Sequence, residues 1–140
     1  MANFIIKTHQ KGNVYKSEHF FILNKGLNSG KPLNEPCANC FVIIFSNSEE
    51  KDSHYWTVFS LWKSKFWHPF LVGSVIPFLR LTEFKKEFFI KSKKVLADFE
   101  SHKKDVAALR LLEQKEKQFL ENINLVNDMR RVILYRYCKR

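Results

Sequence analysis

The chain has 140 residues, of which 45% are hydrophobic and 27% are charged. This composition excludes a disordered chain and a membrane-embedded one, and the length suits a single domain, residues 1–140. Lysine and arginine outnumber aspartate and glutamate by 24 to 14, and aromatic residues make up 15%. The basic and aromatic excesses favour a binding protein over an enzyme.

The sequence predicts a cytoplasmic protein without membrane contact. Residues 1–7 lack the charged, apolar and small-residue regions of a signal peptide. The longest uncharged stretch, residues 66–79, contains prolines and falls short of the roughly 20 apolar residues that a membrane helix needs. The three cysteines cannot all pair within one chain, which suits a reducing compartment.

Short apolar segments in the first half of the chain predict strands. Residues 4–8 and 40–45 are rich in Ile, Val and Phe, whereas residues 19–23 suit either a strand or a short helix. Residues 55–63 combine aromatic and β-branched residues, so we expect a strand that pairs with residues 40–45 as an antiparallel hairpin. Alternation along this strand places on one face Trp56, Val58, Ser60 and Trp62.

After Thr82 the apolar residues follow a helical period, and we expect Thr82 to cap a helix with Glu83 in its first turn. The apolar face of this helix comprises Phe84, Phe88, Val95 and Phe99. A second helix is predicted from about Lys103, with a stripe of Leu109, Leu112, Phe119, Ile123, Val126 and Ile133. Asparagines at positions 122, 124 and 127 are candidate break points, and residues 132–137 suit either helix or a final strand.

These elements predict an α+β fold. A small, mainly antiparallel β-sheet in the strand-rich residues 1–80 precedes two long C-terminal α-helices in residues 81–140. The helices are expected to cover one face of the sheet. We keep the chain as one domain, because neither part is expected to bury its apolar face alone.

Aromatic and basic residues mix in residues 55–80, which contain all three tryptophans. Single-stranded nucleic acid is bound by rings that stack on bases and by Lys or Arg side chains that follow the phosphates. Most rings of such an aromatic chain belong to the core, so only Trp62 and Trp67 are assigned to stacking, with Trp67 expected to be exposed. The residues assigned to phosphates are Lys25, Lys31, Lys63, Lys65 and Arg80.

Two other features lack a required part. Gly26 and Gly30 are separated by three residues, where a phosphate-binding loop has four, and Pro32 stands where Ser or Thr would reach magnesium. Cys37 and Cys40 have the spacing of a zinc knuckle, but the sequence has no second pair. We therefore predict no cofactor and no metal site, and whether this cysteine pair binds metal stays open.

The sequence thus favours a non-enzymatic nucleic-acid-binding protein that prefers single strands. The alternative is an interaction module that forms a homodimer through its C-terminal helices, although Glu116 at an expected seam position weakens a long coiled coil. A metal-dependent enzyme has the least support, and would use Cys37, Cys40, Asp52 and Glu83.

Residues 24–33 and 55–80 resemble an uncharacterised family of small basic proteins from Bacteroides-type bacteria. The most distinctive matching residues are Gly26, Gly30 and Pro32, and the resemblance does not extend to the helical remainder. The family has no assigned activity, so the resemblance implies no catalytic residue and no ligand. It implies a bacterial cytoplasmic protein carried on mobile elements, a setting that favours nucleic-acid handling by association alone.

Overall fold

The computed structural model describes residues 4–139. The chain divides into two compact units, residues 1–99 and 100–140, and each is described by itself. Compactness alone does not show whether a unit folds independently. The single-domain expectation therefore stays a prediction.

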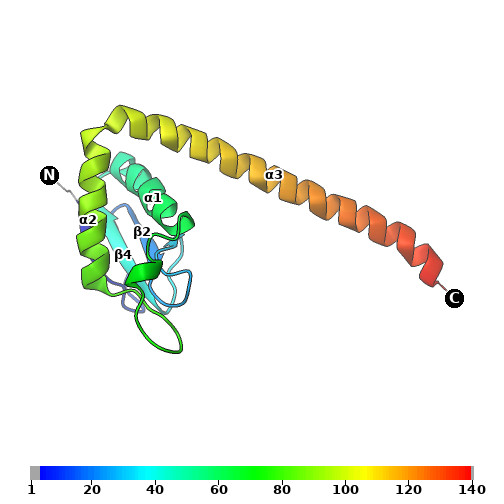
Figure 1. The fold of residues 1–140 in the computed structure, drawn as a ribbon, viewed down its shortest axis with the longest axis horizontal. Helices are drawn as coiled ribbons and strands as arrows, with labels where there is room; N and C mark the ends of the chain where they lie inside the picture. Colours follow the sequence, from blue (N-terminus) through cyan, green and yellow to red (C-terminus); the bar gives the residue numbers. More distant parts are fainter. Residues whose placement is uncertain (1–3, 140) are drawn as a thin grey trace. The chain divides into compact units, whose positions relative to one another are not determined.

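The first unit contains an antiparallel four-stranded sheet in the order β1-β4-β2-β3. β4 (Cys40–Phe45) pairs with β1 (Phe4–Thr8) on one side and with β2 (His19–Leu23) on the other (Figure 1). β3 (Pro32–Leu33) forms an edge of the sheet. Proline is tolerated in an edge strand, because the side that lacks an N–H donor can face away from the ladder. The strands predicted at the positions of β1 and β4 are confirmed. Residues 19–23, which suited either a strand or a short helix, form β2.

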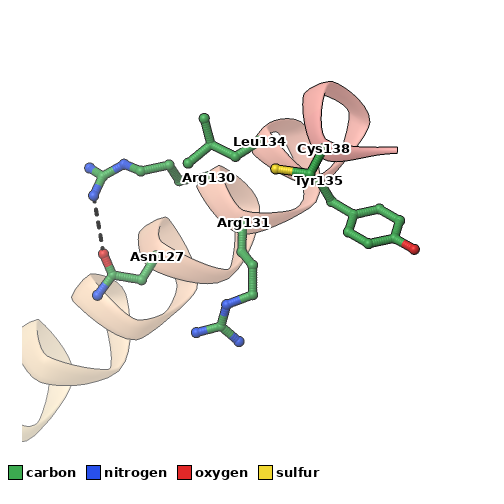
Figure 2. A pocket seen from close by; sticks show the side chains of 6 residues that line it. All are labelled: Asn127, Arg130, Arg131, Leu134, Tyr135 and Cys138. Atoms are coloured by element: carbon green, nitrogen blue, oxygen red, sulfur yellow. Dashed lines mark hydrogen bonds between the residues drawn. The ribbon is translucent and has the colours of Figure 1, made fainter. Parts of the chain in front are cut away.

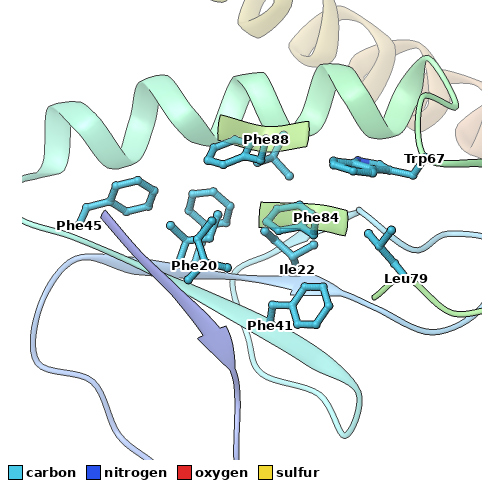
Figure 3. Close-up of a cluster of buried hydrophobic side chains, with 11 residues drawn as sticks. Phe20, Ile22, Phe41, Phe45, Trp67, Leu79, Phe84 and Phe88 are labelled. Carbon is cyan, nitrogen blue, oxygen red and sulfur yellow. The ribbon is translucent and has the colours of Figure 1, made fainter. Parts of the chain in front are cut away.

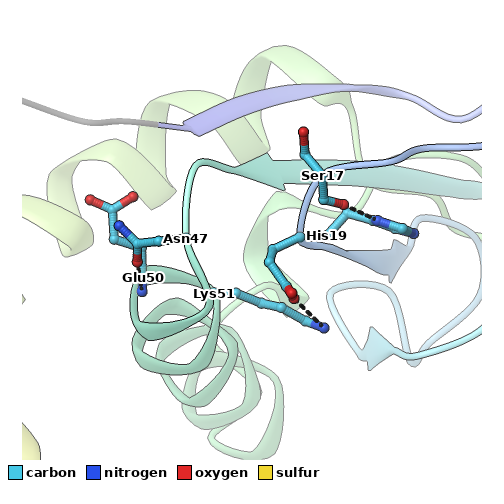
Figure 4. Close-up of polar contacts among 6 residues, drawn as sticks. Ser17, His19, Asn47, Glu50 and Lys51 are labelled. Carbon is cyan, nitrogen blue, oxygen red and sulfur yellow. Dashed lines mark hydrogen bonds and ion pairs between the residues drawn. The ribbon is translucent and has the colours of Figure 1, made fainter.

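The segment predicted as a strand over residues 55–63 belongs to helix α1 (Ser48–Lys63), so that prediction and its hairpin with β4 are wrong. Asn47 caps this helix, because its Oδ1 accepts a hydrogen bond from Glu50 N at 2.9 Å (Figure 4). Acidic residues in the first turn and Lys63 in the last turn complement the helix dipole. These end signals outweigh the β propensity of the aromatic residues between them.

A helical spacing explains one stripe of α1 that faces the core, and Thr57 and Phe59 beside it are buried as well. His54, Val58 and Leu61 lie three or four residues apart and face the core, with His54 and Val58 buried. Trp56 and Trp62, expected to share a strand face with Val58, are half-buried away from this stripe. The predicted alternation over residues 55–63 is therefore wrong as well.

Helix α2 (Leu81–Ala97) packs on the same face of the sheet as α1 (Figures 1 and 3). Its stripe buries Phe84 and Phe88, whose rings stack at 5.5 Å between centroids. The N-cap position belongs to Arg80, so Thr82 lies inside the helix and does not cap it as predicted. The α+β class is confirmed, with three α-helices in residues 4–139 where two were expected.

The core on the helix-covered face is mostly aromatic. The ring centroids of Phe20 and Phe45, which stack, lie 5.5 Å apart, and those of Trp67 and Phe84 lie 5.1 Å apart (Figure 3). Burial of each such side chain contributes about 1.5–3 kcal/mol. A smaller cluster on the other sheet face contains Phe21 and Val42.

Helix α3 (Phe99–Cys138) has 40 residues. The second unit begins at the second residue of this helix, Glu100. The three candidate asparagines do not break it, and residues 132–137 are its last turns (Figure 1). None of its described residues is buried. Within residues 4–139, no helix is long and apolar enough to cross a membrane.

Candidate nucleic-acid interface

The C-terminal end of α1 and the loop of residues 24–31 bring predicted site residues together. The Nζ atoms of Lys63 and Lys31 lie 5.0 Å and 5.2 Å from a ring centroid of Trp62. Trp62 Nε1 donates a hydrogen bond to Asn28 Oδ1 at 3.4 Å. Lys65, two residues after Lys63 in the chain, is grouped with them, and the lysine–tryptophan cluster is defined as Lys31, Trp62, Lys63 and Lys65.

Helix α1 ends in a Schellman motif. Phe66 N donates to Leu61 O and Lys65 N donates to Trp62 O, both at 3.0 Å. This places Lys65 in the left-handed region, with φ +59°, where glycine is the usual residue. A lysine there costs roughly 1 kcal/mol relative to glycine. The fold therefore holds an exposed charged side chain at a position that destabilises it.

The loop of residues 24–31 is held by backbone hydrogen bonds within it and to neighbouring segments. Gly30 N donates to Leu23 O and Gly26 N donates to Pro77 O, both at 2.7 Å. The buried Ser29 binds Gly26 O through both its amide and its hydroxyl group. Because these N–H groups already bind carbonyl oxygens, they do not form a phosphate cradle. Lys31 would reach a phosphate through its side chain.

Trp67 is only 1% exposed, so the prediction that it lies on the surface is wrong. Its indole packs against Gly30 so closely that a Cβ atom added to Gly30 would overlap Trp67 Cδ1. A buried ring offers no face to a base, and Trp67 instead supports the loop that carries Lys31. Its Nε1 atom has no hydrogen-bond partner within residues 4–139.

The remaining predicted phosphate contacts, Lys25 and Arg80, are not part of the lysine–tryptophan cluster. Lys25 forms an isolated β-bridge with Phe78, and Arg80 occupies the N-cap position of α2. Both side chains are exposed. Asn28 was missed by the sequence analysis, because nothing local in the sequence indicates that it meets Trp62.

Fold stability explains part of the lysine–tryptophan cluster. Lys63 in the last turn of α1 interacts favourably with the helix dipole. A cation over an indole contributes about 0.5–1 kcal/mol at an exposed site and more where the pair is desolvated. These effects account for Lys31 and Lys63 around Trp62, but they do not account for a lysine at the strained position of Lys65.

The two closely spaced cysteines are free thiols, and Cys40 is the first residue of β4. Cys40 Sγ donates to Cys37 O at 3.2 Å, and burial raises the pKa of the Cys40 thiol. A raised pKa opposes the thiolate form that metal binding and redox exchange need. No group of three or more His, Cys, Asp or Glu side chains in the described part of the chain is arranged to hold a metal.

The far end of α3 presents apolar and basic side chains on an open surface (Figure 2). Arg130 Nη1 donates a hydrogen bond to Asn127 Oδ1 at 3.4 Å. Arg131 Nη1 forms an ion pair with Asp128 Oδ1 at 3.6 Å. Leu134, Tyr135 and Cys138 line the same shallow hollow. All of these residues come from one helix, so the hollow is helix surface and not an enclosed cavity.

A protein-family model described as "Family of unknown function (DUF6943)" matches residues 6–136. The match includes the whole lysine–tryptophan cluster and nearly all of α3. This agrees with the expected resemblance to an uncharacterised family, but the match extends through the helical residues 81–136, where no resemblance was expected. No curated protein and no solved structure matches the chain.

Proposed function

Because the chain belongs to this family, DUF6943, whose function is unknown, its role must be argued from its own residues, and we propose a non-enzymatic nucleic-acid-binding protein. Lys31, Lys63 and Lys65 would bind phosphates, and Trp62 would stack on a base. Stacking favours single strands, whose bases are open. A bacterial cytoplasmic setting on a mobile element is proposed from the family resemblance alone.

The observation that supports this proposal most strongly is Lys65 at φ +59°. Glycine at this position would stabilise the end of α1, so stability does not explain the lysine. A phosphate contact would explain the lysine, because binding a phosphate requires a cation next to Lys63 at the end of α1. The net charge of +10 adds a long-range attraction for any polyanion.

Stacking on Trp62 requires one of the two lysines over the indole to move aside. A cation–π contact at an exposed site is worth about 0.5–1 kcal/mol, which is less than the roughly 1–3 kcal/mol of one stacked base. The displaced ammonium group would remain close to the nucleotide's own phosphate. The exchange is therefore favourable in the proposed complex.

The test is a tryptophan-fluorescence titration with single- and double-stranded oligonucleotides at two salt concentrations. We expect quenching that prefers single strands, and loss of that quenching in Trp62→Phe. Lys63→Glu should weaken binding about tenfold and flatten the salt dependence. Lys86→Glu, the same charge change on the exposed surface of α2, is the matched control.

No binding at low salt would overturn the proposal. An equal loss of affinity in Lys63→Glu and Lys86→Glu would show non-specific attraction and refute the site. Quenching that survives in Trp62→Phe would refute stacking on this residue.

A second candidate function is self-association through α3, and a specific observation favours it. The helix exposes many large apolar side chains, among them Phe119 at 62% and Ile123 at 53%. Monomeric soluble proteins rarely expose extended apolar patches. In this role the chain is an interaction module, with or without nucleic acid.

A further inference from the structure

A stripe along α3 has charged residues at two of its interior positions. Its members are spaced three or four residues apart, as on one face of a helix. The α3 stripe consists of Leu109, Leu112, Glu116, Phe119, Ile123, Val126, Arg130, Leu134 and Tyr137. Its apolar members are exposed or half-buried. A single helix cannot cover such a stripe by itself.

The two charges are placed symmetrically about Ile123. Glu116 lies seven residues before Ile123 and Arg130 lies seven residues after it. The flanking pair Glu113 and Arg131 repeats this order of acid before base. Glu113 and Arg131 are separated by 18 residues, which is about five helical turns, so they lie on the same side of the stripe.

We propose that α3 docks antiparallel against α3 of a second copy of this chain, around a two-fold axis near Ile123. This inference rests on the self-association proposed above and gives it a direction and a register. Glu116 of each copy then lies beside Arg130 of the other, so opposite charges meet on both sides of the axis. Glu113 comes close to Arg131 of the second copy in the same arrangement.

The apolar ends of the stripe match in this register. Leu109 of one copy lies near Tyr137 of the second copy, and Leu112 lies near Leu134, while the two Ile123 side chains meet at the axis. In each case the two sequence positions are equally far from Ile123. The pairing therefore matches both ends of the stripe and its centre, whereas Phe119 and Val126 lie four residues before and three residues after Ile123 and do not face each other directly.

The parallel arrangement is disfavoured by the same residues. It places Glu116 against Glu116 and Arg130 against Arg130, so both charged positions meet their own kind. Arg130 is also held by its hydrogen bond to Asn127, one turn away (Figure 2). Its guanidinium group has further N–H donors that can bind a carboxylate on a neighbouring helix.

Charge exchange tests the direction of pairing. In the antiparallel dimer, Glu116→Arg places arginine beside Arg130 of the second copy at two sites. We expect its dimer dissociation constant, measured by sedimentation equilibrium, to rise about tenfold, and that of Arg130→Glu likewise. The double variant should recover the original value. Glu121→Arg makes the same charge change off the stripe and should have no such effect.

Cysteine cross-linking provides an independent test. Cys138 is exposed at the end of α3, and the antiparallel register places it near Leu109 of the second copy. Oxidised Leu109→Cys should therefore form a bond between positions 109 and 138 of different copies, identified by peptide mass after a non-reducing gel. These positions lie roughly 44 Å apart along one helix, so the bond cannot form within a copy.

The possible results separate the two proposals. A monomer throughout the micromolar range would refute self-association itself. Two other results would keep self-association but overturn the antiparallel register. One is a dimer cross-linked from 138 to 138 and from 109 to 109. The other is a single charge exchange with no more effect than the Glu121→Arg control.

Discussion

The two units place the same kind of side chain in opposite environments. In the first unit, Phe84 and Phe88 of α2 are fully buried against the sheet. In α3, Ile123 is 53% exposed and Tyr137 is 84% exposed, and no described residue of the helix is buried. The first unit buries its rings within one chain, whereas the apolar side chains of α3 are exposed along the helix.

This contrast shows what each unit is suited to do. Buried apolar area stabilises the first unit and fixes the positions of the loop and helix end that carry the lysine–tryptophan cluster. In the proposed dimer, the same driving force would act on the exposed apolar side chains of α3. Substitutions in the two units should therefore affect different measured quantities.

The largest expected effect is that of truncating a core ring of the first unit. Phe88→Ala should lower the free energy of unfolding by about 3–5 kcal/mol, because it removes a fully buried ring and leaves a cavity. Phe119→Ala makes the same chemical change on α3, where the ring is 62% exposed.

The measurement is denaturant unfolding of the full chain at low concentration, where the proposed dimer is dissociated. Phe119→Ala should change the unfolding free energy of the first unit by less than about 0.5 kcal/mol. Equal losses in the two variants would contradict the contrast between the units.

A somewhat smaller effect is expected where Gly30 packs on Trp67. Gly30→Ala should destabilise the first unit by about 3 kcal/mol, because the new Cβ overlaps the buried indole and φ is +98°. Gly12→Ala is the control, since φ is +89° there but no atom lies within 4 Å of an added Cβ. It should cost only the backbone strain, about 1 kcal/mol. Thermal unfolding of both variants measures the difference, and similar values would refute the role assigned to Trp67.

The smallest effect has the opposite sign. Lys65→Gly should stabilise the first unit by about 1 kcal/mol, because glycine adopts the left-handed conformation of Lys65 without strain. The same variant should bind single-stranded oligonucleotide more weakly, since a phosphate contact is removed. Unfolding and binding are measured on one preparation. A variant that gains stability and keeps its affinity would remove Lys65 from the proposed interface.

The sequence predicted the parts of the fold whose signals are local and unopposed. The apolar run of β4 and the helical spacing of Phe84 and Phe88 each favour one structure, and both predictions are confirmed. In residues 55–63 two signals compete. The aromatic residues suggested a strand, although Asn47 followed three residues later by Glu50 is a helix-start pattern that could have identified α1.

The candidate site was predicted only in part, for a related reason. Lys31 and Trp62 are 31 positions apart, and only the fold determines that they meet. The burial of Trp67 depends on Gly30 and Phe84, which are likewise distant in sequence. Sequence reasoning could choose the types of residue for the site, but it could not tell which rings would be buried.

The most direct test of the account is sedimentation equilibrium of the full chain across the micromolar range. We predict the mass of a dimer at the higher concentrations. An Ile123→Asp variant should be a monomer at every concentration, while its first unit unfolds as in the unaltered chain. A monomer of the unaltered chain at every concentration would contradict the claim that α3 is completed by a second copy.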